Sequence, residues 1–252
     1  MEKIKILTYN IHKGFSTTNR NYALKKVKAS IQKVHADLVF LQEVIGHHDD
    51  HHSHMSDWPT SSQFEYLADQ TWKHFTYGKN AVYTEGHHGN AILSKNPIHF
   101  SENEDVSLST IERRGLLHAK IIHEDRTIHA FCVHLGLFEK DRSRQMKKLI
   151  SRISAQVPPE DSLIIAGDFN DWRESASQLL ISELKVKEAF LELNGKHANT
   201  FPSWLPFLAL DRIYYRNLKC TSVKVLEGKI WYQQSDHLPL FAEFELPEGT
   251  SP

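Results

Sequence analysis

The sequence of 252 residues has few cysteines, almost no net charge and no long apolar run, and each absence excludes a class of protein. Two cysteines, Cys132 and Cys220, cannot build a framework of several disulfides and fit a reducing compartment. Lys and Arg number 30 against 31 Asp and Glu, so a net charge of −1 does not indicate a polyanion binder. No apolar run approaches the roughly 18–20 residues of a membrane-spanning helix, and no secretory hydrophobic segment precedes the first strand-like run. We therefore expect a cytoplasmic protein, with export by a signal-independent route left open.

The chain also lacks internal repeats, linkers rich in Gly, Ser or Pro, and long runs of one charge sign. Nothing marks a domain boundary, so we expect one domain over residues 1–252, acting as a monomer without a stable protein partner. Hydrophobic residues make up 40% and charged residues 24% of the chain, which is ordinary for a globular protein. The composition predicts a folded chain that buries a substantial core rather than a disordered one.

Short strand-like runs alternate with helical stretches through the first two thirds of the chain. Apolar patterning predicts strands over residues 3–10, 37–44, 90–94, 116–122, 127–135, 162–166, 211–215, 222–226 and 238–246. The helical period predicts helices over residues 22–34, 63–75 and 142–155. Such alternation is typical of an α/β layered domain with helices outside the sheets.

Polar residues gather at the ends of these predicted strands. They are Asn10, Glu43, His134, Asp168, Asn170, Asp211, Asp236 and His237. Any one of them alone is more often a helix cap or a surface residue. Together, carboxylates, amides and imidazoles at several strand ends indicate one shared cleft at a sheet edge, where the active sites of α/β proteins form.

Seven short motifs contain most of these residues. They are Thr8-Tyr9-Asn10, Leu41-Gln42-Glu43-Val44, Gly89-Asn90-Ala91-Ile92-Leu93-Ser94, Val133-His134-Leu135, Gly167-Asp168-Phe169-Asn170, Leu210-Asp211-Arg212-Ile213 and Ser235-Asp236-His237-Leu238-Pro239. In this order, the set resembles the metal-dependent endonuclease/exonuclease/phosphatase superfamily, to which DNase I belongs. The resemblance implies a DNase I-like α/β (α+β) fold, a four-layered sandwich of two packed mixed β-sheets flanked by helices. It also implies a hydrolase of phosphoric esters.

The resemblance implies a divalent metal near the first two motifs. Glu43 matches the family's acidic ligand, and a carboxylate is a hard oxygen ligand suited to Mg²⁺ or Mn²⁺. Asn10 and Asp236 are the further metal-binding candidates, with Asp236 serving the water or a second metal. Whether the site holds one metal or two stays open at this point. The metal would neutralise charge on the phosphate and on the leaving oxygen.

The catalytic candidates carried over from the family are Asp168, Asn170, Asp211, His237 and His134. Asp168 would orient or deprotonate the attacking water, which requires a raised pKa or a water activated by metal. Asn170 would donate hydrogen bonds to the phosphate. Asp211 would hold the ring of His237, which would bind the phosphate, although His237 stays open as the general base. His134 would stabilise the transition state or protonate the leaving group.

Substrate binding is expected from Asn90 and Arg114, together with Asn170. Arg114 could hold phosphate oxygens bidentately, and a surface ion pair is an equal alternative. The implied substrate is a phosphoester, with a lipid headgroup, a small molecule and a nucleic acid as candidates. We expect a phosphodiesterase that uses in-line attack by water, with a lipid-linked or small phosphoester as its candidate substrate. A DNA or RNA nuclease is the alternative, and an inactive binding module of the same fold is less favoured.

Three further segments attract attention. The histidine-rich residues 47–54 suit transition metals, but a solvated loop beside the cleft is the better interpretation. Cys132 lies on an apolar strand and is expected to be a buried packing residue. The uncharged stretch from Thr200 to Leu210 contains Trp204 and Phe207. It is interpreted first as a buried connection and second as an apolar rim beside the catalytic phosphate.

Overall fold

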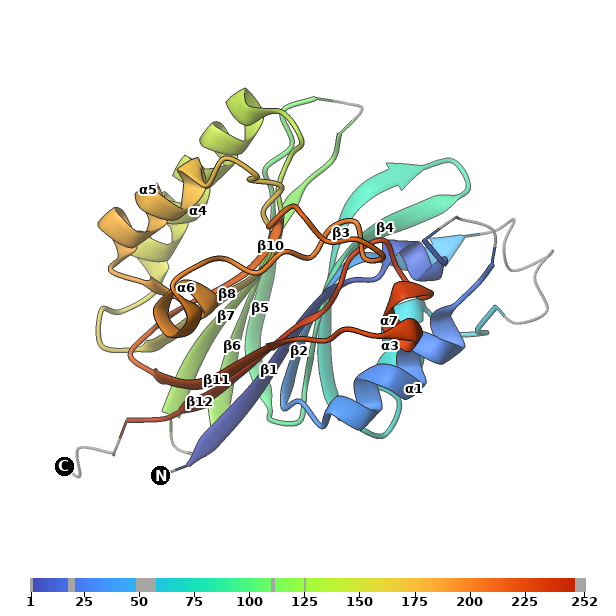
Figure 1. Ribbon diagram of the computed structural model, residues 1–252, viewed down its shortest axis with the longest axis horizontal. Helices are drawn as coiled ribbons and strands as arrows, with labels where there is room; N and C mark the ends of the chain where they lie inside the picture. Colours follow the sequence, from blue (N-terminus) through green and yellow to red (C-terminus); the bar gives the residue numbers. More distant parts are fainter. Residues whose placement is uncertain (1, 18–20, 49–57, 110–111, 125, 248–252) are drawn as a thin grey trace.

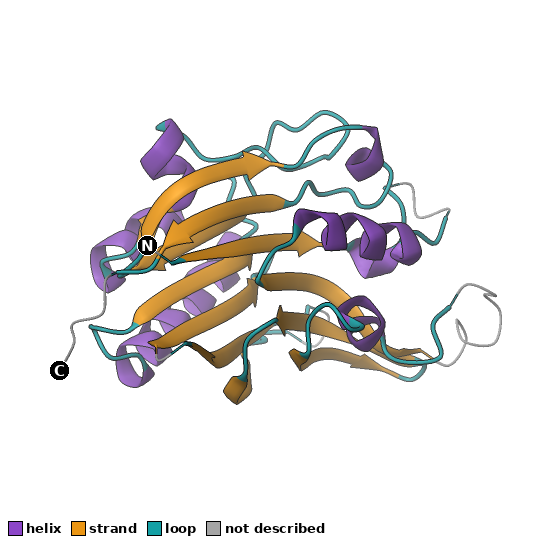
Figure 2. Cartoon of the chain, turned by 90° about the horizontal axis from the view of Figure 1, so that it is seen from below, coloured by secondary structure: helices purple, strands orange, loops and turns teal. Residues whose placement is uncertain are grey.

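The computed structural model describes residues 2–17, 21–48, 58–109, 112–124 and 126–247, and these form two six-stranded sheets packed face to face (Figures 1 and 2). The first sheet, in the order β11-β12-β1-β2-β4-β3, contains β1 (Lys3–Asn10), β2 (Leu38–His48), β3 (His74–Tyr83), β4 (Gly86–Ser94), β11 (Lys219–Val225) and β12 (Leu240–Glu245). The second, in the order β5-β6-β7-β8-β10-β9, contains β5 (Ile98–Asp105), β6 (Gly115–His123), β7 (Arg126–His134), β8 (Ser162–Asp168), β9 (Lys187–Glu188) and β10 (Asp211–Arg216). Each sheet is mixed, because β1 pairs with β2 and β7 with β8 in parallel, whereas their other neighbours are antiparallel.

Helices cover the outer face of each sheet (Figure 1). The first sheet carries α1 (Leu24–Val34) and α3 (Gln63–Ala68), and the second carries α4 (Glu139–Gln156) and α5 (Ser175–Leu184). The shorter elements are η1 (His12–Gly14), α6 (Ala189–Asn194) and α7 (Lys229–Tyr232). Within the described ranges, none of the helices combines the length and the apolar character needed to cross a membrane.

Alternation along the strands builds the layers. In β1, Ile4 and Ile6 pack between the two sheets, whereas Leu7 and Tyr9 face α1. In β8, Ile164 lies in the core between the sheets while its neighbours pack toward α4 and α5. Because successive side chains of a strand point to opposite faces, strands buried on both faces are apolar throughout. The four-layered sandwich predicted from the sequence is therefore confirmed.

Two predicted segments differ from the structure. The helix expected over residues 63–75 ends at Ala68, where Asp69 takes a positive φ of 44° and breaks the helical path. Trp72, which looked helical by its spacing, is instead buried in the connection, with its Nε1 donating to the carbonyl of Ala36 at 3.1 Å. The prediction of a loop over residues 47–54 is wrong for His47 and His48, which belong to β2 and pair with β4. Residues 49–54 lie outside the described residues.

A buried histidine pair far from the strand ends makes stability sensitive to acid. His118 donates or accepts through Nε2 to Nδ1 of His129 at 3.0 Å, and His129 Nε2 lies 3.0 Å from Asp161. Both rings are buried, and His118 stacks on Phe131 with ring centroids 4.1 Å apart. Burial lowers the pKa of His118 to about 3 and also lowers the pKa of His129. Both rings are therefore neutral in the folded protein at neutral pH.

The unfolded chain binds these protons near the ordinary histidine pKa of about 6.5, well before the folded protein does. The stabilisation is thus fully present above about pH 6.5 and is lost as the pH falls from there toward 3. The substitution His118→Gln keeps a donor for His129 but removes the titrating ring of residue 118. We therefore expect stability to fall less steeply with pH, by up to about tenfold in the folding equilibrium constant per pH unit. Urea unfolding between pH 7 and pH 4 measures it, with the exposed His99→Gln as control. Identical pH slopes for wild type and His118→Gln would contradict this assignment.

Candidate active site

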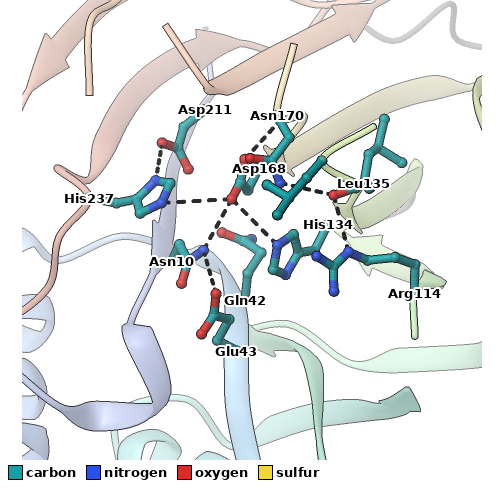
Figure 3. A network of polar contacts seen from close by, with 12 residues as sticks. Asn10, Gln42, Glu43, Arg114, His134, Leu135, Asp168, Asn170, Asp211 and His237 are labelled. Atoms are coloured by element: carbon teal, nitrogen blue, oxygen red, sulfur yellow. Dashed lines mark hydrogen bonds and ion pairs between the residues drawn. The ribbon is translucent and has the colours of Figure 1, made fainter. Parts of the chain in front are cut away.

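The pairing register brings the polar strand ends to one edge that both sheets share. Asn10 at the end of β1 pairs with Gln42 in β2, and His134 at the end of β7 pairs with Asp168 at the end of β8. Asp211 begins β10 opposite Asp168 because these two strands run antiparallel. Asn10 Nδ2 then donates to Asp168 Oδ2 at 3.1 Å, which joins the first sheet to the second (Figure 3).

A bulge in β2 positions the acidic residue of the second motif. The register between β2 and β4 shifts between Leu41 and Val44, so that Gln42 and Glu43 together stand opposite one residue of β4. Glu43 takes a positive φ of 56°, a conformation uncommon for a residue with a Cβ. Bulges are frequent beside active sites, where they redirect a side chain. Here the bulge directs the Glu43 carboxylate toward the amide of Asn10, whose Nδ2 donates to its Oε1 at 3.3 Å (Figure 3).

Asp168 Oδ2 is the point on which the site converges. Besides Asn10, it faces His134 Nε2 at 3.6 Å and His237 Nε2 at 3.8 Å (Figure 3). The other oxygen, Oδ1, accepts from the backbone N–H of Asn170 at 2.9 Å, which fixes the orientation of the carboxylate. Burial raises the pKa of Asp168 well above its ordinary value, and the nearby Asp211 raises it further. The carboxylate is therefore a stronger base than an exposed aspartate.

Gly167 allows β8 to carry Asp168 so close to β7. Its φ is 144°, and a Cβ built at this position would lie 2.0 Å from the carbonyl oxygen of Val133. A larger residue is excluded by both the backbone conformation and the space. Steric constraints therefore explain the glycine of the Gly-Asp-x-Asn motif, independently of any role in catalysis.

His237 is held by Asp211, the pairing that the family resemblance implies. Its Nδ1 lies 2.8 Å from Asp211 Oδ2, and that oxygen also accepts from the hydroxyl of Thr200 at 2.6 Å. Burial alone would lower the pKa of His237, but the attraction of Asp211 and Asp168 outweighs it and raises the pKa well above its ordinary value. The ring is therefore an imidazolium at neutral pH, with Nε2 directed toward Asp168.

His134 has the opposite protonation state. Burial, followed by the charges of Arg114 and His237, holds its pKa well below the ordinary value, so the ring is neutral. Arg114 reaches this part of the site through Nε, which donates to the carbonyl of Leu135 at 3.1 Å. It also forms an ion pair with Glu112 at 2.8 Å. Arg114 thus makes the ion pair named as the alternative and also lies beside the site.

Asn10 and Asp236, the further metal-binding candidates, both make polar contacts within the protein. Asn10 Oδ1 accepts from the backbone N–H of His12 at 3.1 Å, and its Nδ2 donates to two carboxylates. In this arrangement the Asn10 amide is a donor that holds Glu43 and Asp168 in place. Asp236 forms an ion pair with His12 at 3.1 Å, and this hydrogen bond raises the pKa of His12. The metal-binding roles of Asn10 and Asp236 stay predictions.

Two amide side chains predicted to bind substrate are engaged with the backbone. Asn90 is buried opposite the β2 bulge, and its Nδ2 donates to the carbonyls of Gly115 and Cys132 in the other sheet. Asn170 Nδ2 donates to the carbonyl of Leu135 at 2.9 Å, which uses one of its two amide hydrogens. These contacts show how Asn90 joins the two sheets beneath the site. Substrate binding by either residue stays a prediction.

Several residues of this region were missed at the sequence level. Gln42 lies beside Asn10, its partner in the strand register, and its position inside a quoted motif was the available signal (Figure 3). His12 lies two residues after Asn10 and had no prediction, whereas His88, directly before the motif that begins at Gly89, could be expected to face the cleft but had no predicted role. Burial lowers the pKa of His88 to about 4, with Lys13 lowering it and Glu43 opposing. Thr200 had no sequence signal, because only the fold brings its hydroxyl to Asp211.

The donor set suits a hard divalent cation. Glu43 and Asp168 offer carboxylate oxygens, and Asp168, Asp211 and His237 present ligand atoms within 4.8 Å of one another. Among the described residues, Asp211 Oδ1 and Gln42 Oε1 are buried acceptors without a hydrogen-bond donor. A site rich in carboxylate and amide oxygens matches Mg²⁺ or Mn²⁺ better than a thiophilic metal.

The two other segments singled out in the sequence are now placed. Cys132 is buried between the sheets as predicted, and burial raises the pKa of its thiol to about 12. The interpretation of residues 200–210 as a buried connection is wrong for the tip of the segment. Trp204 and Phe207 are exposed, because the backbone turns there into a short hairpin bridged between Phe201 and Leu208.

Two sheets with this topology and a cluster of carboxylates and histidines at their common edge define a class of phosphoester hydrolase. The model of the Endonuclease/Exonuclease/phosphatase family matches residues 7–237, and the chain belongs to this family. Members of the family are hydrolases that act on phosphoesters and generally use divalent metals.

Among curated proteins, the chain is 44% identical over 244 residues to YbhP of Escherichia coli strain K12, a protein described as uncharacterized, covering 96% of each chain. Many solved structures are similar in fold, two of which follow. An endonuclease/exonuclease/phosphatase of Beutenbergia cavernae has a TM-score of 0.79 at 18% identity, covering 98% of this chain and 72% of that one. Danio rerio TDP2 complexed with a single-strand DNA product has a TM-score of 0.71 at 18% identity, covering 97% and 100%. At such identities the structures establish the fold alone.

Proposed function

We propose that the chain is a Mg²⁺-dependent phosphodiesterase in which Asp168 activates the attacking water and His237 binds the phosphate. The observation that carries the proposal is the convergence of Asn10, His134 and His237 on one oxygen of a buried carboxylate with a raised pKa. A general base works best when its pKa lies near the working pH, and burial moves Asp168 in that direction. The proposal treats residues 1–252 as one functional domain.

The two histidines have different tasks in this proposal. His237, charged and fixed by Asp211, donates a charge-assisted hydrogen bond from Nε2 to a phosphate oxygen. Because His134 is neutral, it supports the transition state as a hydrogen-bond donor rather than as the acid that protonates the leaving group. Asn170 orients the Asp168 carboxylate through its backbone N–H, and its side-chain amide borders the same space.

Glu43 is the principal residue proposed to hold the metal, with Asn10 fixing the position of its carboxylate. Mn²⁺ is an alternative, since both ions prefer oxygen ligands. When bound, the ion supplies positive charge that stabilises the phosphate and the leaving oxygen. Glu43 suits this task because its side chain is only half-buried and stands on a bulge that faces the polar cluster.

Replacing Glu43 tests the metal assignment. We expect Glu43→Gln to weaken activation by Mg²⁺ and to lower turnover of bis-p-nitrophenyl phosphate by on the order of 10²-fold, because a neutral amide is a poorer ligand than a carboxylate. Chelator should abolish wild-type turnover, and added Mg²⁺ or Mn²⁺ should restore it. The matched control is Glu192→Gln, which only removes an exposed ion pair with Lys187. Full wild-type activity in chelator would reject the metal dependence.

For the substrate we propose a lipid-linked or small phosphodiester. The support is the exposed apolar tip of residues 200–210, a segment that contacts His237 through Phe201, together with a net charge of −1. The second candidate is a nuclease, favoured by the similarity in fold to a TDP2 structure that contains a single-strand DNA product. A panel of duplex DNA, abasic DNA, RNA, phospholipids and inositol phosphates, each with Mg²⁺, Mn²⁺ or chelator, separates the two.

A further inference from the structure

Large apolar side chains are exposed on three loops that border the candidate site. Their exposed fractions lie between 47% and 69%, and we name them together the apolar rim: Leu137, Phe138, Trp172, Trp204, Leu205 and Phe207. One loop follows His134 at the end of β7, another follows Asp168 at the end of β8, and the last precedes Asp211 at the start of β10. Exposed apolar patches of this kind usually mark interaction sites rather than folding needs.

Hydrogen bonds tie the three loops to one another. Arg212 Nη2 donates to the carbonyl of Asp171, next to Trp172, at 2.8 Å and to the carbonyl of Ala209 at 2.9 Å. Arg142 donates to the carbonyl of Gly136 and lies 4.8 Å from the ring centroid of Trp172. The three loops therefore lie together at the edge of the second sheet where β7, β8 and β10 carry His134, Asp168 and Asp211.

The hairpin that carries half of the rim is fixed directly on the catalytic cluster. Ser203 donates through its N–H to the carbonyl of Asp236 and through its hydroxyl to the carbonyl of Ser235, both at 2.7 Å. The ring of Phe201 lies 5.1 Å from the ring of His237. Whatever binds the tip at Trp204 is thus held at a set position relative to His237.

We propose that the apolar rim docks on a lipid bilayer surface and brings the phosphodiester of a lipid headgroup to Asp168 and His237; this rests on the proposed function and assigns its substrate class. The eleven positions from Thr200 to Leu210 contain no charged residue, so inserting the tip desolvates no charge. Trp and Phe favour the boundary between headgroups and acyl chains, and Leu favours the apolar side.

The rim chemistry favours a lipid surface over a nucleic-acid strand. Strands bind through Lys and Arg that neutralise phosphates, with aromatic rings as stacking platforms. Two arginines beside the rim are engaged elsewhere: Arg173 pairs with Glu139 at 2.9 Å, and Arg142 is buried under Trp172. Leu137 and Leu205 offer apolar surface without a ring on which a base could stack.

The test is co-sedimentation of the full chain with vesicles of phosphatidylcholine and phosphatidylglycerol in equal parts. We expect the wild type to bind, and the double substitution Trp204→Ser with Phe207→Ser to lower vesicle partitioning at least about tenfold. The control, Leu193→Ser with Ile230→Ser, removes apolar side chains that are also exposed but lie outside the three loops, and it should bind like wild type. Thermal unfolding should be nearly unchanged in both, since exposed side chains contribute little to packing.

Hydrolysis of bis-p-nitrophenyl phosphate without vesicles separates this inference from the proposed function. It should be equal in the wild type and the rim variant, while turnover of phosphatidylglycerol in vesicles falls with binding. No vesicle binding by the wild type, equal loss in rim and control variants, or binding of single-strand DNA in place of vesicles would overturn the docking proposal. Vesicle binding without hydrolysis of any phosphodiester would retain the docking surface and reject the catalytic function. If the double variant unfolds at a lower temperature, the single substitution Leu205→Ser gives the same comparison.

Discussion

Replacing Asp168 with asparagine should lower the turnover of phosphodiesters by at least on the order of 10²-fold while the protein stays folded. The amide keeps the size of the carboxylate and can still accept from the backbone N–H of Asn170, so the turn that carries it is preserved. It cannot take a proton from water at neutral pH. It also removes one of the three carboxylates that hold His237 charged, so phosphate binding weakens together with water activation.

Steady-state kinetics with bis-p-nitrophenyl phosphate measure this effect, with thermal unfolding recorded in parallel. Asp168→Ala should lower turnover by a similar factor. A similar loss in both variants shows that the missing base causes it, and not a misdirected amide hydrogen in Asp168→Asn. The matched control is Asp69→Asn, at an exposed aspartate that pairs with Lys28 at 2.9 Å. His237→Ala should also lose on the order of 10²-fold, because a preorganised charge contact is removed. Turnover within a few-fold of wild type for Asp168→Asn would remove this residue from the mechanism.

The parts of the fold that were predictable are those with a strong apolar pattern. The strand predicted over residues 3–10 coincides with β1, and that over 211–215 differs from β10 by one residue. Strands buried on both faces read as continuous apolar runs, and the sequence shows them directly. By contrast, β3 and β5 were not predicted. Each lies at the outer end of its sheet with half-exposed, polar-rich positions, so neither has a distinctive pattern.

The candidate site was predictable as a set of strand ends and much less as a set of contacts. Strand pairing brings His134, Asp168 and Asp211 together at the ends of β7, β8 and β10, and the packing of the two sheets adds Asn10 from the end of β1. The bulge that turns Glu43 toward Asn10 was not foreseen, because an extra residue in one strand appears only against its partner. The pairing of Asp236 with His12 likewise depends on how the last loop packs on β1.

Arg212 directly follows the site residue Asp211. We expect it to contribute to the stability of the fold rather than to the catalytic reaction. Its side chain is fully buried and forms an ion pair at 3.6 Å with Asp171, which is also fully buried. The guanidinium donates to Ser177 Oγ at 2.6 Å and to the carbonyls of Asp171 and Ala209. Removing one partner of a buried ion pair leaves the other charge uncompensated in a medium where charges are poorly solvated.

We therefore expect Arg212→Met to lower the free energy of unfolding by about 3–5 kcal/mol, a large fraction of the roughly 5–15 kcal/mol that holds a typical domain folded. Arg212→Lys should recover little of this, because an ammonium group cannot reproduce the planar fork that reaches both carbonyls. Combining Arg212→Met with Asp171→Asn should cost less than Arg212→Met alone, since the buried charge is then removed as well. Urea unfolding measures all three, with Arg173→Met at an exposed ion pair as the control that should change stability by less than about 1 kcal/mol. A loss for Arg212→Met no larger than that of the control would show that the buried guanidinium does not hold the two loops together.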